Sequence, residues 1–216
     1  MPASPDGVAL VGRSLDSHCA RLSGCRRCGL PPGVRPILST ARAPRAMLVG
    51  QAPGKVEMGG GKPFAGRAGR TLFRWLERAG LDEATAREWL YIAAITRCFP
   101  GASASGRGDR VPSPAERANC AEWLTAELSI IKPRLIIPVG RLAIDRFLGQ
   151  VPLNRVVGKA HSYAYDGGNA VVIPLPHPSG ASSWVNVPAH RELLDGGIKL
   201  IEGFFRTAVD QEGSVN

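Results

Sequence analysis

Residues 46–66 read AMLVGQAPGKVEMGGGKPFAG, and this stretch carries the pattern that predicts the fold. Its first five residues form an apolar run that ends in Gly50, which is typical of a buried β-strand. A glycine-rich loop is expected from Gln51 to Gly66. Apolar side chains then recur at helical spacing from Leu72 to Ala79, and Gly80 ends that pattern. A strand, a loop and a helix in this order form one unit of an α/β domain.

Three further apolar runs predict strands over residues 90–96, 134–140 and 170–175. Their residues are apolar almost without interruption, so each strand is expected to be buried on both faces. Strands that alternate with helices indicate a parallel sheet with helices on both sides. The sequence therefore predicts an α/β fold in three layers.

Helix signals separate these strands. Asp82 is the expected N-cap of a short helix, and Ser113 and Glu116 stand at the spacing of a capping box. Helices are expected over about 8–24, 82–89, 114 onward, 141–148 and 190–208. We expect one domain over residues 1–216, with residues 1–24 as a helical lead-in and 209–216 as a disordered tail.

The charge of the chain points to its partner. Lys and Arg number 27 against 18 Asp and Glu, a formal net charge of +9. Such an excess favours nucleic acid, because neutralised phosphates release counterions; a merely basic surface is the alternative. The sequence has no apolar run of about 18 residues and no secretory signal pattern. A cytoplasmic protein without a membrane partner is therefore expected, with a monomer as the default.

Four of the five cysteines stand in a pattern that suits a metal group. Cys25 and Cys28 form one Cys-x2-Cys pair, and Cys98 and Cys120 follow separately. A zinc ribbon offers two tight pairs, whereas thiolates from separate elements are compatible with a [4Fe-4S] cluster. Zinc and plain buried thiols remain alternatives at this point. Cys19 is expected to be a small buried side chain.

Polar residues follow the predicted strands at their carboxyl ends. Gln51, Arg97, Gly140 and His177 all come just after a strand, and ligands of parallel sheets gather at this edge. The loop after Gly50 can present backbone N–H groups to an anion. His177, on a turn made rigid by proline, can donate a hydrogen bond to a developing oxyanion.

Taken in order, these motifs resemble the iron–sulfur uracil-DNA glycosylases of families 4 and 5. The order is Cys-x2-Cys, GQAPG, KPFAG, a cysteine after a strand, Pro-x-Pro-Ala-Glu, a further cysteine and HPSG, and it extends from Cys25 to the last helix. The resemblance implies a four-stranded parallel sheet flanked by helices. It also implies that Phe64 stacks on a flipped base and that His177 contacts the base or its sugar. The implied [4Fe-4S] ligands are Cys25, Cys28, Cys98 and Cys120.

Three positions depart from those families. Family 4 has Glu at the position of Gln51, family 5 has Asp at the position of Arg67, and a pyrimidine-reading Asn of family 4 relatives corresponds to Ala94. The gap between the third and fourth cysteines is also longer, which predicts an inserted loop around residues 101–110. The substrate is expected to contact Gly50, Gln51, Ala52, Pro53, Gly54, Phe64, Ala94 and Ser179.

The expected chemistry depends on stabilising the departing base more than on activating water. His177 would stabilise the base, and Gln51 would orient a water through its amide oxygen. Glu57 is a fallback carboxylate, expected in a solvated loop. Contacts to DNA phosphates are expected from Arg97, Arg107 and Arg110. Trp184 or Val185 would wedge into the base stack, with packing of the loop onto the sheet as the alternative for Trp184.

The predicted function is that of a monofunctional DNA repair glycosylase, which flips uracil out of DNA and hydrolyses its N-glycosidic bond. The first alternative is a glycosylase with hypoxanthine or xanthine as its main target, favoured by the loss of the Asn at Ala94. The second is a catalytically weak module that binds lesions in DNA, favoured by the missing carboxylates.

Overall fold

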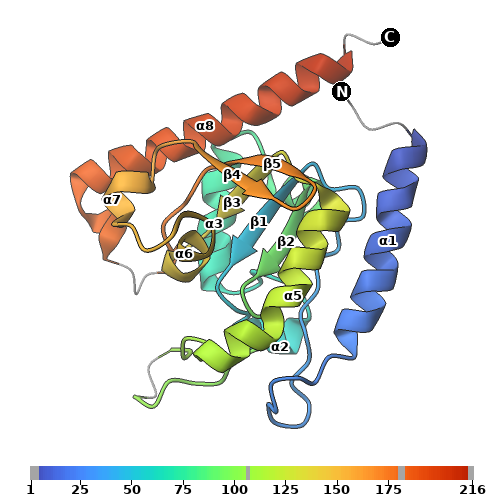
Figure 1. Cartoon of the computed structure of the whole chain (residues 1–216). Coiled ribbons are helices and arrows are strands. Elements are labelled where there is room, and N and C mark those ends of the chain that lie inside the picture. Colours follow the sequence, from blue (N-terminus) through green and yellow to red (C-terminus); the bar gives the residue numbers. More distant parts are fainter. Residues whose placement is uncertain (1–4, 106–107, 180–182, 214–216) are drawn as a thin grey trace.

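The computed structural model describes residues 5–105, 108–179 and 183–213. This part of the chain forms a five-stranded sheet with helices on both sides (Figure 1). The strands are β1 (Ala46–Gly50), β2 (Leu90–Ala94), β3 (Leu135–Pro138), β4 (His161–Tyr165) and β5 (Gly168–Val172). The helices are α1 (Pro5–Ser23), α2 (Lys55–Gly60), α3 (Arg67–Glu77), α4 (Glu83–Trp89), α5 (Pro114–Ile131), α6 (Arg141–Leu148), α7 (Leu153–Val156) and α8 (Pro188–Gly213), with a 3-10 turn η1 (Trp184–Asn186).

Four strands of the sheet are the predicted ones, and they are parallel as expected. The strand order is β2-β1-β3-β5-β4, in which β2, β1, β3 and β5 pair in parallel. The expected number of strands is one too low, because β4 pairs with β5 in an antiparallel hairpin. β4 lies at the edge of the sheet, and its residues alternate between half-buried and exposed instead of forming an apolar run. The Asp166-Gly167 turn before β5, with Gly167 at φ 95°, is the local signal of this hairpin.

Alternate residues of the strands pack against different helices, which produces three layers. In β1, Leu48 faces a core formed with α3, α4 and α8. Its neighbours Met47 and Val49 face a second core formed with α1, α5 and α6. Figure 1 shows α8 crossing one side of the sheet, with α1 and α5 beside each other on the opposite side. Both faces of the parallel strands are therefore covered, as their apolar runs predict.

The capping signals in the sequence are confirmed. The side chain of Asp82 accepts a hydrogen bond from the Thr85 N–H at 2.7 Å. Ser113 and Glu116 form the reciprocal capping box that begins α5, with Ser113 N–H 2.7 Å from the Glu116 carboxylate.

Three helices differ from the expectation, and the short α7 is one that the sequence analysis did not predict. α2 lies inside the segment expected to be a loop, because the Glu57 carboxylate accepts a hydrogen bond from the N–H of its N-cap, Gly54. α8 extends to Gly213, since no proline or glycine interrupts residues 204–212, so residues 209–213 belong to a helix and not to a tail. None of the described helices is both long and apolar enough to cross a membrane.

Candidate active site and cysteine centre

The carboxyl ends of β1, β2 and β3 open into one cavity of about 370 Å³. Gly50 and Ala94 lie at the ends of β1 and β2, and His177 comes from the segment after β5. The structure brings together here all the residues predicted to contact the substrate, namely Gly50, Gln51, Ala52, Pro53, Gly54, Phe64, Ala94, His177 and Ser179. These residues lie up to 129 positions apart in the chain, from Gly50 to Ser179, and it is their common place after strands that predicts the cavity.

Phe64 is held in an unusual backbone conformation at one side of the cavity. Its φ is 52°, in the left-handed region that side chains other than glycine rarely adopt. Its ring lies against Gly50, where a Cβ would meet Cζ of Phe64 at 2.8 Å. Arg87 donates to the backbone carbonyl of Pro63 at 3.0 Å, which secures the chain just before the phenylalanine. The position of the ring therefore requires a glycine at the end of β1.

The Gln51–Gly54 loop is organised by Glu57, which the sequence reasoning placed in a solvated loop. The Glu57 side chain is buried, with 9% of its surface exposed. One oxygen accepts from the Gly54 N–H at 3.0 Å and the other from the Gly66 N–H at 2.8 Å. The expectation for Glu57 is therefore wrong, because two backbone N–H groups draw the carboxylate inward. Because the Gly54 N–H already donates to Glu57, this N–H is occupied within the protein.

His177 is oriented by Ser179. The Ser179 backbone N–H donates to Nδ1 of His177 at 3.2 Å, and the Ser179 hydroxyl lies 2.8 Å from the same nitrogen. A nitrogen that accepts from a backbone N–H carries no proton, so the proton of the neutral ring is on Nε2. Burial lowers the pKa of His177 below 6.5, which favours this neutral form. Gly140, at φ 85°, permits the approach, since a Cβ there would meet the ring at 2.9 Å.

Asp109 is a residue of the cavity that the sequence reasoning missed. It lies in the long loop between Cys98 and Cys120, and it is exposed to solvent while lining the cavity. The pKa of Asp109 is raised, chiefly because the carboxylate loses solvent, while a hydrogen bond from the Lys55 N–H acts in the opposite direction. The Gly108-Asp109 dipeptide is a turn signal, but the sequence does not tell which surface the turn approaches.

Arg97 is not available to DNA phosphates, contrary to the expectation. Its side chain is 2% exposed, and Nη2 donates to the Glu127 carboxylate. Glu127 is completely buried and also accepts from Tyr91 at 2.9 Å, with His18 Nε2 at 3.1 Å. A buried carboxylate without a charge partner would be costly, and this explains why Arg97 points inward.

Of the other two residues predicted to contact phosphates, one is paired within the protein and one lies outside the described residues. Arg110 donates to both oxygens of Glu116, at 2.7 and 2.5 Å, and its side chain keeps 35% exposure. Its contact with DNA stays a prediction, and the guanidinium that would make this contact is already paired with Glu116. Arg107 lies outside the described residues.

The predicted wedge is packed against the protein's own last helix. The Trp184 ring stacks on His190 with 4.2 Å between ring centroids, and its carbonyl oxygen lies 2.9 Å from Nδ1 of His190. Val185 packs against the core on the α3, α4 and α8 side of the sheet. Trp184 therefore packs within the protein, but onto α8 and not onto the sheet as the alternative to the wedge had it. The exposed apolar side chain of this segment is Val187, at 45%.

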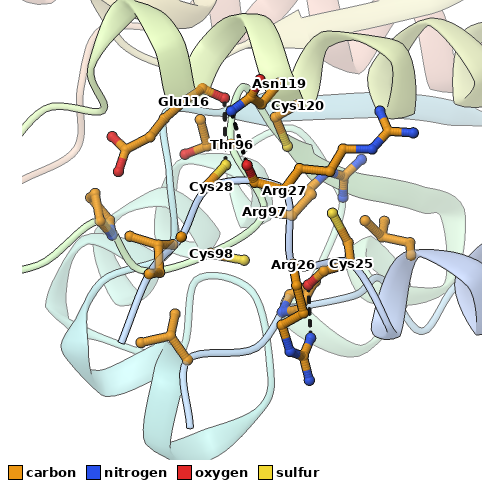
Figure 2. Close-up of a pocket in the computed structure, with 16 residues that line it drawn as sticks. Cys25, Arg26, Arg27, Cys28, Thr96, Arg97, Cys98, Glu116, Asn119 and Cys120 are labelled. Carbon is orange, nitrogen blue, oxygen red and sulfur yellow. Dashed lines mark hydrogen bonds between the residues drawn. The ribbon is translucent and has the colours of Figure 1, made fainter. Parts of the chain in front are cut away.

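A second cavity, of about 220 Å³, is lined by all four cysteines of the predicted centre. Cys25 and Cys28 lie after α1, Cys98 lies after β2, and Cys120 lies on α5. Figure 2 shows their sulfur atoms directed toward a common space. Cys19 is apart from them and is buried with its sulfur 3.8 Å from the Tyr91 hydroxyl, as expected for a structural thiol.

Four thiols around one cavity are a donor set of the kind that binds zinc or an iron–sulfur cluster. Within the described residues, no three His, Cys, Asp or Glu side chains converge on a point that one metal ion could occupy. Tetrahedral zinc would need four sulfur atoms at about 2.3 Å from one point. Burial, followed by the neighbouring thiols, raises the pKa of Cys98 to about 12, so that this thiol is costly to ionise without a cation nearby. The chemistry of the four cysteines, which come from the segment after α1, the segment after β2 and α5, fits the ligand set of an iron–sulfur cluster.

Comparison with known proteins assigns the class. The family model described as the uracil DNA glycosylase superfamily matches residues 38–194, and the chain belongs to this superfamily. A type-4 uracil-DNA glycosylase of Archaeoglobus fulgidus is 31% identical over 196 residues, which cover 87% of this chain and 92% of that protein. One of Thermotoga maritima is 34% identical over 137 residues, 62% of this chain and 65% of its own length.

The fold has a solved counterpart. The crystal structure of wild-type Pedobacter heparinus SMUG2 superposes with a TM-score of 0.53, covering 93% of this chain and 98% of its own, at 15% identity. At this identity the likeness concerns the fold alone. It agrees with the predicted class, an α/β sandwich of the uracil-DNA glycosylase type, with one more strand than expected.

Proposed function

We propose that this protein is a monofunctional glycosylase that flips uracil out of DNA and hydrolyses its N-glycosidic bond, leaving an abasic site. The observation that carries the proposal is the single cavity lined by His177, Phe64 and the Gln51 loop. Relatives named type-4 uracil-DNA glycosylase support it. Among the described residues lining the cavity none is lysine, and this supports hydrolysis rather than attack by an amine.

Base binding would depend on Phe64. A base inside a duplex must be extruded at a cost of a few kcal/mol, and stacking on an aromatic ring returns about 1–3 kcal/mol. The ring of Phe64 is fixed between the Gly50 backbone and a strained main chain, so that it would lose little freedom when a base arrives. Ala94, which lines the same cavity, has a small side chain that would leave room for the base.

Bond cleavage would depend on His177. The departing uracil gains negative charge as its bond to the sugar breaks, and an N–H donor placed there stabilises that charge. His177 is neutral and has its proton on Nε2, which is the donor this step requires. Gln51 would orient the attacking water through its amide oxygen, which can accept a hydrogen bond but not a proton at neutral pH.

The cysteine centre would have a structural role. Cys25, Cys28, Cys98 and Cys120 would hold a [4Fe-4S] cluster, which supplies a covalent cross-link between separate elements when bound. These cysteines join α1, the segment after β2 and α5, and that segment also reaches the base cavity through Arg97 and Pro100. DNA would bind to the basic surface of the protein, in keeping with its net charge of +9. That the protein is a monomer stays a prediction.

The test uses labelled oligonucleotides that carry uracil, hypoxanthine or xanthine, incubated with the purified protein and then treated with alkali. Cleavage at uracil supports the proposal. Cleavage at the purine lesions alone would replace uracil by a deaminated purine as the substrate. Oligonucleotides that bind without being cut would leave a lesion-binding module and overturn the proposed activity.

A further inference from the structure

The base cavity contains a carboxylate that neither the motifs nor the mechanism above uses. Of the described residues that line the cavity, two carry carboxylates, Glu57 and Asp109. Hydrolysis at the sugar requires a water made nucleophilic, and a carboxylate can accept its proton, as in glycoside hydrolysis. Both candidates approach Gly54 at the position of its missing side chain, where a Cβ would meet an oxygen of Asp109 at 2.7 Å and one of Glu57 at 2.8 Å.

Glu57 is committed to the backbone. Its two oxygens accept from Gly54 and Gly66, at 3.0 and 2.8 Å, and the side chain is buried. Protonation would weaken both hydrogen bonds and loosen the loop that forms the cavity wall. Glu57 therefore maintains the loop and is poorly placed to exchange protons with a substrate water.

Asp109 has the access that Glu57 lacks. It is exposed to solvent while lining the cavity, and the Lys55 N–H donates to its carboxylate. The residue as a whole is exposed, but its carboxylate lies against Gly54 and is partly withdrawn from solvent, which raises its pKa above the usual value; the charge of Glu57 adds to this rise. A base with a raised pKa holds a proton more strongly during the reaction, which favours proton transfer from water.

The loop that carries Asp109 is anchored on both sides. Asp109 pairs with Ala102 in an antiparallel bridge, and the Ser103 N–H donates to the carbonyl of Gly108 at 3.0 Å. The next residue, Arg110, makes its two hydrogen bonds to Glu116 at the start of α5. A general base must be held within reach of its water, and this double attachment meets that need.

We propose that Asp109 is the general base of the hydrolysis, in a role that rests on the proposed function. The carboxylate accepts a proton from the attacking water while the water oxygen forms its bond to C1′ of the sugar. The C1′–N1 bond breaks, and its electron pair leaves with the uracil anion, which His177 stabilises. Asp109 then returns the proton to solvent, and the uracil anion takes up a proton from solvent.

The test measures single-turnover excision of uracil from a single-stranded oligonucleotide by the holoprotein. Asp109→Asn keeps the size of the side chain and an acceptor for the Lys55 N–H, but it cannot take a proton. We expect its rate to fall by about 100-fold or more. Its affinity for an oligonucleotide with uncleavable 2′-fluoro-deoxyuridine should be unchanged. Asp166→Asn, the same change in the exposed β4–β5 turn, is the matched control and should excise at the wild-type rate.

A small carboxylate provides a second readout. Added formate should restore part of the rate of Asp109→Ala and none of the rate of His177→Ala, since only the first lacks a carboxylate. An Asp109→Asn protein that excises at the wild-type rate overturns the inference and leaves the proposed function intact. Loss of binding together with excision also overturns it, because Asp109 would then only shape the cavity. A wild-type protein without excision overturns the proposed function and this role with it.

Discussion

The backbone N–H of Ser179 donates to Nδ1 of His177 at 3.2 Å, and this hydrogen bond determines which ring nitrogen carries the proton. The imidazole therefore presents Nε2–H as its donor. Since the two residues are only two positions apart, the HPSG turn carries its own orienting group. The predictions below begin with this pair.

His177→Ala removes the donor that we propose faces the departing base. We expect the excision rate to fall by about 10²- to 10³-fold, the loss typical of one donor to a developing anion. Burial lowers the pKa of His177, so the neutral ring is present at pH 6.5 and becomes charged only at lower pH. The His177-dependent part of the rate should therefore be constant at neutral pH and change only on acidification. Single-turnover rates of the wild type and His177→Ala across pH test this; equal rates would contradict the role.

Gly50→Ala tests the fixed position of Phe64. The new Cβ would lie 2.8 Å from Cζ of Phe64, so that the ring must move. We expect affinity for uncleavable uracil DNA to fall by about 1–3 kcal/mol, the worth of one stacked base. The matched control is Gly203→Ala on α8, where a Cβ would meet nothing within 4 Å. That control should bind normally and gain about 0.5–1 kcal/mol in free energy of unfolding. Normal binding by Gly50→Ala would show that the ring does not hold the base.

Cys98→Ser tests the cysteine centre. We expect it to lose bound iron and the visible absorbance of an iron–sulfur group, because the cavity would keep three of its four thiols. Cys19→Ser should retain both, since Cys19 lies beside Tyr91 and not in that cavity. Iron and zinc analysis of the purified proteins, with absorption spectra, decides the matter. One zinc ion per protein in place of iron would contradict the cluster.

Glu116→Gln tests the anchor of the Asp109 loop through stability. Hydrogen bonds from Arg110 hold the pKa of Glu116 at about 2, below its usual 4.5. The lowered pKa in the folded protein means that this stabilisation is complete above pH 4.5 and is lost as the pH falls through about 2. At neutral pH the variant should lose roughly 1–3 kcal/mol in free energy of unfolding.

Urea unfolding at several pH values measures this effect. The difference between wild type and Glu116→Gln should shrink as the pH falls through the lowered pKa. Arg110→Met should behave like Glu116→Gln, because it removes the other partner of the same pair. A difference that does not vary with pH would show that the ion pair is not the cause.

Much of the fold follows from local patterns in the sequence. Apolar runs such as that from Ala46 to Gly50 predicted the parallel strands, since a strand buried on both faces needs apolar side chains throughout. Asp82 and the Ser113–Glu116 pair predicted helix starts, because a cap involves residues within one turn. The base cavity was also predictable, because parallel strands bring their carboxyl ends to one edge. β4 escaped prediction because an edge strand with one solvated face lacks the apolar run.

Only the tertiary structure decided the partners of the charged side chains. The sequence predicted that Arg97 contacts phosphates, but its partner in the structure is the buried Glu127, 30 residues away in the chain. Glu57 was expected to be solvated, but its carboxylate accepts hydrogen bonds from the N–H groups of Gly54 and Gly66. Asp109 reaches Gly54 from a loop more than 50 positions along the chain. Periodicity and caps are read within a few residues, whereas the partner of a charge depends on which distant segments the packed core brings together.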